Sequence, residues 1–398
     1  MSEQSLRELV RAEPVPGTDE ARERGLVLVN QAYAERRAPR RTALPRLAIA
    51  LVAATLLAAL LLSPAGAAVR DWIDDVFTAG VRHAEPALTE LPGGGRLLVE
   101  SPRGPWVVQP DGARRLLGHY DEATWSPHGL FVAAAGGRTL SAIEPDGTPR
   151  WSITAPGQVS EPRWSPSGFR IAYRAGRSLR VERADGTGGA LVAAASAAVA
   201  PAWYPPGPHL LAYVDAGAKL RIANADSGAT LSSVPARPHV SALSWRTNGG
   251  QLLQVSPRAL WLRSVRTNKL EQSLALGPQR RLALPRGATV RAAAFAPRAK
   301  AIAALLHRRI GREGRDEVIV LGLDGGPPRR LFAISGRLSG LTWSPDGSRL
   351  LVGWPAADQW LFLSVGRGRI KAVDGIGATF APGNRGSRRL PRVEGWCC

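Results

Sequence analysis

The sequence repeats a short motif, an aromatic residue followed by Ser-Pro-x-Gly or a degraded form of it. Successive aromatic residues lie 39, 39, 42, 50, 48 and 37 residues apart. A period near forty residues is typical of a four-stranded propeller blade, which buries its apolar faces only by stacking against other blades. The positions that carry the repeat are Trp125, Pro127, Gly129, Trp164, Pro166, Gly168, Trp203, Pro205, Gly207, Trp245, Gly249, Phe295, Pro297, Trp343, Pro345, Gly347, Phe380 and Pro382.

Each motif position has a predicted structural role. The aromatic residue ends one strand and fills the space between neighbouring blades. Proline has no N–H and therefore ends the strand pairing, while glycine takes the left-handed turn position. A second strand is predicted directly after the motif, as at 170–173 and 349–352, and an Asp-Gly hairpin turn follows later, as at Asp146 and Asp324.

These units resemble the WD40-like (PD40) propeller repeat of the TolB-type family, whose blades carry Trp-Ser-Pro-Asp-Gly after the first strand. Residues 343–347 match that pattern at every position, and the units at 125, 164 and 203 match it with substitutions. The resemblance covers about residues 96–383 and implies an all-β propeller with a role in an envelope complex. TolB-type proteins are usually soluble in the periplasm, so the apolar segment described below is a departure.

The number of blades follows from the two ends of the repeat region. Seven aromatic corners are present, but too little chain follows Phe380 to complete a blade. Segments 96–100, 106–108 and 115–117 are predicted strands that precede the first corner. Pairing them with the segment around Phe380 would complete a blade and leave no open sheet edge. We therefore predict seven blades, with six as the alternative.

Residues 47–69 form an apolar segment without a charged residue. A helix needs about 20 such residues to cross ~30 Å of hydrocarbon. Five arginines lie between residues 36 and 46, and three aspartates between 71 and 75, so the positive-inside rule places the N-terminus in the cytoplasm. A cleaved signal peptide is the alternative, because Ala65-Gly66-Ala67 resembles a cleavage site, although the preceding charged region is unusually long for one.

Together these features predict a single-pass protein of the bacterial plasma membrane whose propeller is extracytoplasmic. The predicted parts are a cytoplasmic tail 1–46, a transmembrane helix 47–69, a juxtamembrane linker 70–95, a propeller 96–383 and a C-terminal tail 384–398.

No set of residues has the spacing of a catalytic, cofactor-binding or metal-binding site. The chain has no G-x-S-x-G motif, and its six histidines are scattered singly. His128 and His209 lie in or beside motif turns and are interpreted as turn surface. The Asp-Gly turns lack the dense carboxylates of a calcium loop. We therefore predict that the chain is not an enzyme and has no cofactor.

Cys397 and Cys398 are the only cysteines. Their spacing rules out a zinc site or a disulfide framework. The two thiols can be free, bonded to each other, or bridged to another chain, and the fold cannot depend on them.

The net charge of +20 comes from 52 Lys and Arg against 32 Asp and Glu. Such a balance suits an anionic partner, although a composition biased towards arginine on a solvated surface gives the same number. The predicted function is a non-catalytic binding or scaffold module for a protein or an anionic envelope polymer, and nucleic acid is not expected. The alternative is a transmembrane regulator whose tail, residues 1–46, binds a transcription-related factor while the propeller senses outside. An enzyme ranks third.

Overall fold

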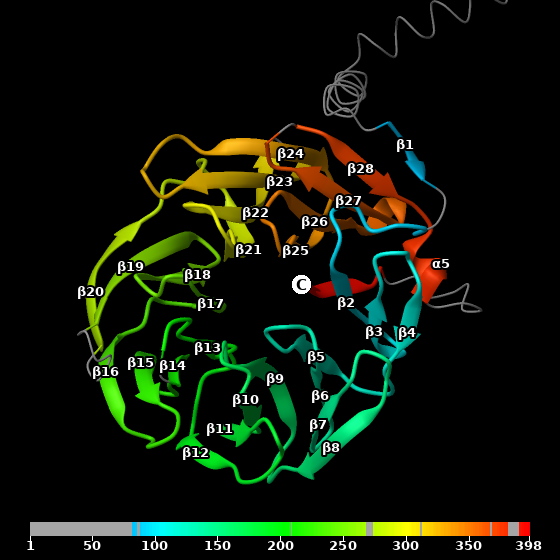
Figure 1. Ribbon diagram of the computed structural model, residues 1–398. Coiled ribbons are helices and arrows are strands. Elements are labelled where there is room, and N and C mark those ends of the chain that lie inside the picture. The colour runs from blue at the N-terminus through cyan, green and yellow to red at the C-terminus, as the bar shows by residue number, and fades with distance from the viewer. Residues whose placement is uncertain are drawn as a thin grey trace, which may run out of the picture. The chain divides into compact units, whose positions relative to one another are not determined.

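The computed structural model describes residues 82–85, 88–207, 209–267, 274–310, 313–366, 368–380 and 390–398. These residues form seven blades arranged in a ring (Figure 1). In each blade the first strand lies nearest the centre and the fourth lies at the rim. The predicted all-β propeller with seven blades is confirmed.

Six blades are built from consecutive strands, each paired antiparallel with the next. The first three blades comprise β5 (Glu122–Trp125), β6 (Val132–Gly136), β7 (Thr139–Ile143), β8 (Pro149–Thr154), β9 (Val159–Trp164), β10 (Arg170–Ala175), β11 (Ser178–Arg183), β12 (Ala190–Ala193), β13 (Ala202–Trp203), β14 (Leu210–Val214), β15 (Lys219–Asn224) and β16 (Thr230–Pro235).

The fourth to sixth blades comprise β17 (Ala242–Trp245), β18 (Gln251–Ser256), β19 (Ala259–Thr267), β20 (Leu274–Arg281), β21 (Thr289–Phe295), β22 (Ala301–Ile310), β23 (Glu313–Gly322), β24 (Arg329–Ser335), β25 (Ser339–Trp343), β26 (Arg349–Trp354), β27 (Gln359–Ser364) and β28 (Ile370–Val373). A short 3₁₀ turn, η1 (Pro355–Ala357), joins β26 to β27. A fifth strand, β1 (Arg82–Glu85), pairs parallel with β28, so part of the predicted linker 70–95 belongs to a sheet.

The seventh, closing blade combines both ends of the repeat region. Its strands are β29 (Arg392–Cys397), β2 (Arg96–Ser101), β3 (Gly104–Val108) and β4 (Arg114–Leu116), in that order from the centre outwards. β29 pairs antiparallel with β2, which places Cys397 opposite Arg96 and Arg392 opposite Glu100. The prediction that distant segments share one blade is therefore confirmed, and no inner strand is missing from the ring.

The identity of the closing segment was predicted wrongly. The inner strand is 392–397, so the propeller extends beyond residue 383 and the segment 384–398 is not simply a tail. Phe380 instead ends a short helix, α5 (Ile376–Phe380), where its ring packs edge-on against Trp106 at 5.6 Å. The side chain fills the outer part of the junction between the sixth and closing blades, so it is unavailable as an inner corner.

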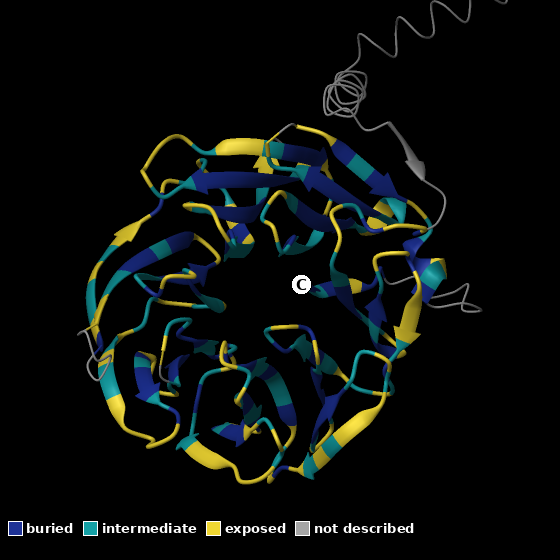
Figure 2. Cartoon of the chain, viewed as in Figure 1, coloured by how far each residue is buried: buried dark blue, intermediate teal, exposed yellow. Residues whose placement is uncertain are grey.

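The core consists of seven apolar clusters, each shared by two neighbouring blades. Figure 2 shows buried residues along the middle strands and exposed residues concentrated in turns and at the rim. One inner-strand aromatic side chain packs in or against each cluster, as predicted for the motif. The seven are Trp125, Trp164, Trp203, Trp245, Phe295, Trp343 and Trp396.

Three of these tryptophans also hydrogen-bond across the blade junction. The Nε1 of Trp203 donates to the carbonyl oxygen of Arg163 at 2.8 Å, and that of Trp245 to Ala202 at 3.0 Å. Trp343 repeats the pattern with Ala294 at 3.2 Å. Each acceptor immediately precedes the aromatic residue of the previous blade, so the repeat sets the spacing between neighbouring inner strands.

Among the described residues, no helix is both long and apolar enough to span a membrane. The predicted tail 1–46 and transmembrane segment 47–69 lie outside the described residues.

Candidate functional site

The motif residues themselves are used by the fold. The hydroxyl oxygens of Ser126, Ser165 and Ser344 each accept the backbone N–H five residues later, at 2.9 to 3.0 Å. Each inner strand of the first six blades ends at its aromatic residue, just before the motif prolines Pro127, Pro166, Pro205, Pro297 and Pro345. Pro382 lies outside the described residues.

The motif glycines occupy the predicted left-handed position. Their φ angles lie between 64° and 78°, a region in which a side chain is strained. They are Gly129, Gly168, Gly207, Gly249 and Gly347. The turn conformation therefore accounts for these glycines without a binding role.

Two cavities on one face of the ring are the strongest candidates. One is lined by side chains on inner strands and on β2, and it adjoins an open hollow at the strand entries. The other is lined by the turn between the second and third strands of one blade and by the loop after its fourth strand. The antiparallel topology puts this hollow, turn and loop on the face opposite the motif turns. The motif residues line neither of them.

The carboxylate cavity lies where the closing, first and second blades meet. Its volume is about 260 Å³, and it adjoins a more open hollow of about 460 Å³. Four carboxyl groups and two guanidinium groups line it: Glu100 on β2, Glu122 on β5, Glu161 and Arg163 on β9, and Arg392 and Glu394 on β29.

Hydrogen bonds hold these carboxyl groups across three blades. Arg392 binds Glu100 at 2.9 Å and also pairs with Glu394. The carboxylate of Glu122, in the first blade, accepts the backbone N–H of Glu161, in the second blade, at 2.6 Å. Glu161 has a left-handed φ of 54°, which is strained for a glutamate, and this hydrogen bond offsets part of the strain.

Burial and mutual repulsion perturb the cavity's acids. Burial, followed by the negative charge of Glu100, raises the pKa of Glu394 to about 7, and the opposing effect of Arg392 is smaller. Burial also raises the pKa of Glu122. The cavity therefore favours a proton or another cationic group over an anion. Among the described residues, no group of three or more His, Cys, Asp and Glu is arranged to hold a metal ion.

The arginine cavity lies between the fourth and fifth blades and has a volume of about 430 Å³. Arg258, from the turn between β18 and β19, and Arg281 and Arg286, from the end of β20 and the loop that follows, are all exposed. Apolar and small residues, including Leu282 and Leu284, complete the lining. Within the described part of the chain no acidic residue lines this cavity, so the charge of this lining is entirely positive.

A stack of cations extends from the arginine cavity into the fourth blade. The guanidinium of Arg237 lies 4.1 Å from the ring of Trp261, and that of Arg281 lies 5.9 Å from the same ring. Arg263 is buried nearby, where burial and then the charge of Arg237 lower its pKa. The indole face partly offsets the repulsion between these cations.

Sequence reasoning missed one further arrangement, on the motif-turn face. The Nε2 of His209 lies 3.0 Å from the hydroxyl of Ser167, and its Nδ1 lies 2.7 Å from Asp226. Burial alone would raise the pKa of Asp226, but hydrogen bonds with His209 and Arg170 lower it.

This order of groups matches that of a hydrolytic triad. However, Asp226 is 45% exposed, Ser167 is exposed, and the imidazole packs edge-on against Trp203 at 6.2 Å. An open triad cannot exclude water from the reacting atoms, so we interpret the contacts as a tie between the second and third blades. The expected absence of enzymatic activity stays a prediction.

The carboxylate cavity could not be found from local patterns, because its four glutamates come from three blades. The general excess of arginine in the sequence indicated a basic surface, but no feature of the sequence predicted where the arginine cavity lies.

No family model matches the sequence, and no curated protein matches it. Solved structures do resemble the fold. The β-propeller domain of Cps50 (Swd1) from Myceliophteria thermophila has a TM-score of 0.52 and 14% identity, over 73% of this chain and 97% of that one. KlHsv2 with loop 6CD replaced by a Gly-Ser linker has a TM-score of 0.50 and 10% identity, over 72% of this chain and 97% of that one.

A hydrazine synthase of Kuenenia stuttgartiensis also matches, over 61% of this chain and 75% of that one, with 13% identity. Its TM-score of 0.48 is too low to bear on the activity of this chain. Because 1262 solved chains resemble the fold, the likeness establishes a β-propeller and does not select one ligand.

Proposed function

We propose that the chain is a membrane-anchored, extracytoplasmic propeller that binds an anionic partner, a protein or an envelope polymer, without catalysing a reaction. The propeller fold suits a protein-binding or scaffold module, because turns and loops from every blade meet on each face of the ring. The observation that carries the choice of partner is the arginine cavity, with three exposed guanidinium groups and no acidic residue among the described residues that line it.

The chemistry of the cavity supports phosphate or carboxylate as the recognised group. A guanidinium presents a planar fork of N–H donors that matches either anion with two parallel hydrogen bonds. Arg281 uses one donor on the backbone carbonyl oxygen of Arg258 at 3.0 Å, which fixes the Arg281 guanidinium beside the turn that carries Arg258. All three arginines line one hollow of about 430 Å³, which has room for a phosphate or carboxylate group.

Two features of the sequence support the location. The apolar residues 47–69 have the length of a membrane span, and arginines precede them. The resemblance of the repeat to that of TolB-type proteins agrees with a place in the cell envelope. Protease added to intact spheroplasts tests the topology: digestion of the propeller with protection of residues 1–46 is expected, and a fully protected chain would refute it.

The binding experiment uses the full chain in detergent and two probes, a poly(glycerol phosphate) and a polyglutamate. The triple variant Arg258→Gln, Arg281→Gln and Arg286→Gln is expected to weaken binding ten-fold or more. Each lost hydrogen bond to a charged group contributes about 1.5 kcal/mol or more. Binding by the native chain should also weaken steeply as salt rises.

A matched control removes the same charge from exposed arginines outside the cavity, with Arg114→Gln, Arg115→Gln and Arg330→Gln. Retention of binding by the control locates recognition in the arginine cavity. Equal weakening in both triples would assign binding to the general charge of the surface. Failure of the native chain to bind either polymer would contradict the proposal.

A further inference from the structure

The last two residues of the sequence, Cys397 and Cys398, form a disulfide with each other. The sequence left three states open for them, and the structure selects this one. Cys397 is the final residue of β29 and is buried, whereas Cys398 is exposed. In Figure 1 the end of β29 lies close to the centre of the ring.

This disulfide contributes little to the stability of the fold. Its two cysteines are adjacent, so the bond closes no loop of chain and gains almost none of the entropy by which disulfides stabilise folds. β29 is already held by its pairing with β2 over residues 392–397. Reducing the bond therefore leaves the closing blade with its strand pairing intact.

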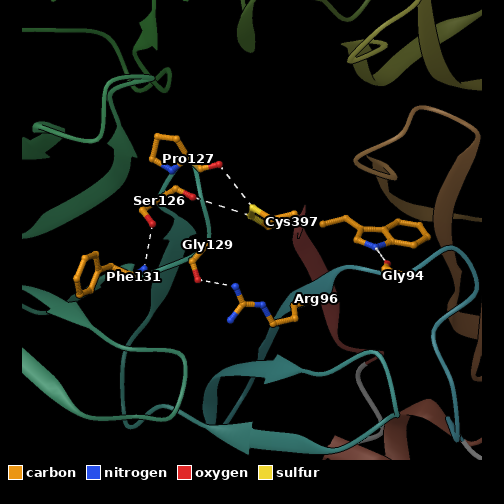
Figure 3. Close-up of a disulfide and its surroundings, with 9 residues drawn as sticks. Gly94, Arg96, Ser126, Pro127, Gly129, Phe131 and Cys397 are labelled. Atoms are coloured by element: carbon orange, nitrogen blue, oxygen red, sulfur yellow. Dashed lines mark hydrogen bonds between the residues drawn. A yellow bond between two sulfur atoms is a disulfide. The ribbon is translucent and has the colours of Figure 1, made fainter.

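The surroundings bring a cation to the two sulfur atoms. A Cβ atom at Gly129 would lie 3.0 and 3.2 Å from the sulfurs of Cys397 and Cys398, and 2.6 Å from the guanidinium of Arg96. All three groups therefore meet around a glycine that leaves room for them. Arg96 is fixed there by a 2.7 Å bond to the carbonyl oxygen of Gly129 (Figure 3). Its guanidinium also stacks over Trp125.

The same pocket also suits the reduced pair. The sulfur of Cys398 lies 3.5 Å from the carbonyl oxygen of Pro127, and that of Cys397 lies 4.0 Å from that of Ser126 (Figure 3). Each sulfur therefore has a carbonyl acceptor nearby for the S–H that reduction would create. A neighbouring guanidinium also stabilises a thiolate, the form in which a sulfur leaves during exchange.

We propose that Cys397 and Cys398 form a thiol–disulfide exchange site whose partner is a small thiol or a protein dithiol. The partner's thiolate attacks the exposed Sγ of Cys398 and forms a mixed disulfide. The electron pair of the broken bond leaves on the Sγ of Cys397 beside Arg96, and this thiolate then takes a proton. A second partner thiolate attacks the partner's sulfur in the mixed disulfide and releases Cys398, which is protonated. Two electrons and two protons reach the chain, and the partner leaves as a disulfide.

The test treats the full chain in detergent with dithiothreitol, without denaturant, and counts thiols by alkylation and mass spectrometry. No alkylation is expected before reduction, and two alkylated thiols per chain are expected afterwards, with an unchanged circular dichroism spectrum. Oxidised glutathione should restore the bond. Free thiols in the air-purified chain, disulfide-linked dimers, or reduction only after unfolding would each overturn the proposal.

Two comparisons test the assigned direction and the role of Arg96. Arg96→Gln is expected to slow reduction about three-fold, because it removes the cation that stabilises the leaving thiolate. Arg103→Gln, which removes an arginine stacked on Trp106 at 5.8 Å, is the matched control and should leave the rate unchanged. In addition, the thiol left by Cys397→Ser should be alkylated faster than that left by Cys398→Ser. An unchanged rate in Arg96→Gln would overturn the role of that arginine, and the reverse order of alkylation would overturn the assigned direction of attack.

Discussion

Replacing Glu394 with glutamine is expected to stabilise the closed ring at pH 8 and to change it little at pH 5. Burial and the charge of Glu100 raise the pKa of Glu394 to about 7 from an ordinary value of 4.5. The folded protein therefore holds the proton of Glu394 more tightly than the unfolded chain does. Glutamine keeps the size of the side chain and removes the ionisation.

The magnitude follows from linkage between protonation and folding. Below pH 4.5 the carboxyl group is protonated in both states and its ionisation costs nothing. As the pH rises towards 7, only the unfolded chain ionises, and the cost to stability grows until it levels off above pH 7. At about 1.36 kcal/mol per pKa unit, the full cost is about 3 kcal/mol, and at pH 5 it is below about 1 kcal/mol. The side chain is only 19% exposed, so solvent screening reduces this figure little.

Thermal unfolding followed by circular dichroism at pH 5 and pH 8, at one scan rate, measures the difference. The midpoint should rise by several degrees at pH 8 in Glu394→Gln and by much less at pH 5. Glu90→Gln, which changes an exposed glutamate outside the cavity, should leave both midpoints unchanged. A lower midpoint at pH 8, or an equal shift at both pH values, would show that the ion pair with Arg392 outweighs burial and repulsion.

Three further predictions concern the ring and its turns. Trp343→Ala should lower the free energy of unfolding by about 3–5 kcal/mol, because it leaves a cavity between two blades. Trp343→Phe should lower it by only about 1 kcal/mol, because it removes mainly the hydrogen bond to Ala294. Chemical denaturation distinguishes the two variants. Deleting residues 392–398 should expose the edge of β2 and the apolar surface that Val393 and Trp396 cover, and cause self-association, seen by light scattering; a stable monomer would contradict the closure. His209→Ala should lower stability by about 1 kcal/mol, and neither the native chain nor Ser167→Ala should react with a fluorophosphonate; labelling that depends on Ser167 would revive the hydrolytic interpretation.

The blades could be predicted from the sequence because the motif acts locally. An aromatic side chain, a residue without an N–H and a glycine at positive φ each fix one feature of a strand end or turn within a few residues. The unit at 343–347 shows this best. Ser344 accepts the N–H of Arg349 at 2.9 Å, Gly347 has a φ of 72°, and Trp343 fills the junction with the preceding blade.

Local patterns failed at the end of the chain, where pairing decides. Phe380 begins a motif-like segment and Trp396 does not, yet Trp396 is the inner aromatic residue of the closing blade. Which segment closes the ring depends on pairing with β2, about 300 residues earlier. The residues near Phe380 and Trp396 in the sequence do not indicate which of the two segments pairs with β2.

The tertiary structure alone decided the candidate sites. Glu100 and Glu394 lie at opposite ends of the propeller sequence and share a cavity only because β29 pairs with β2. The same closure brings Cys397 beside Arg96 and the turn at Gly129. The reactivity of a charged group or a sulfur atom depends on the groups around it. In the ring, these neighbouring groups come from segments distant in the sequence. The repeat therefore specifies the ring, and closure of the ring creates the carboxylate cavity and the surroundings of the disulfide.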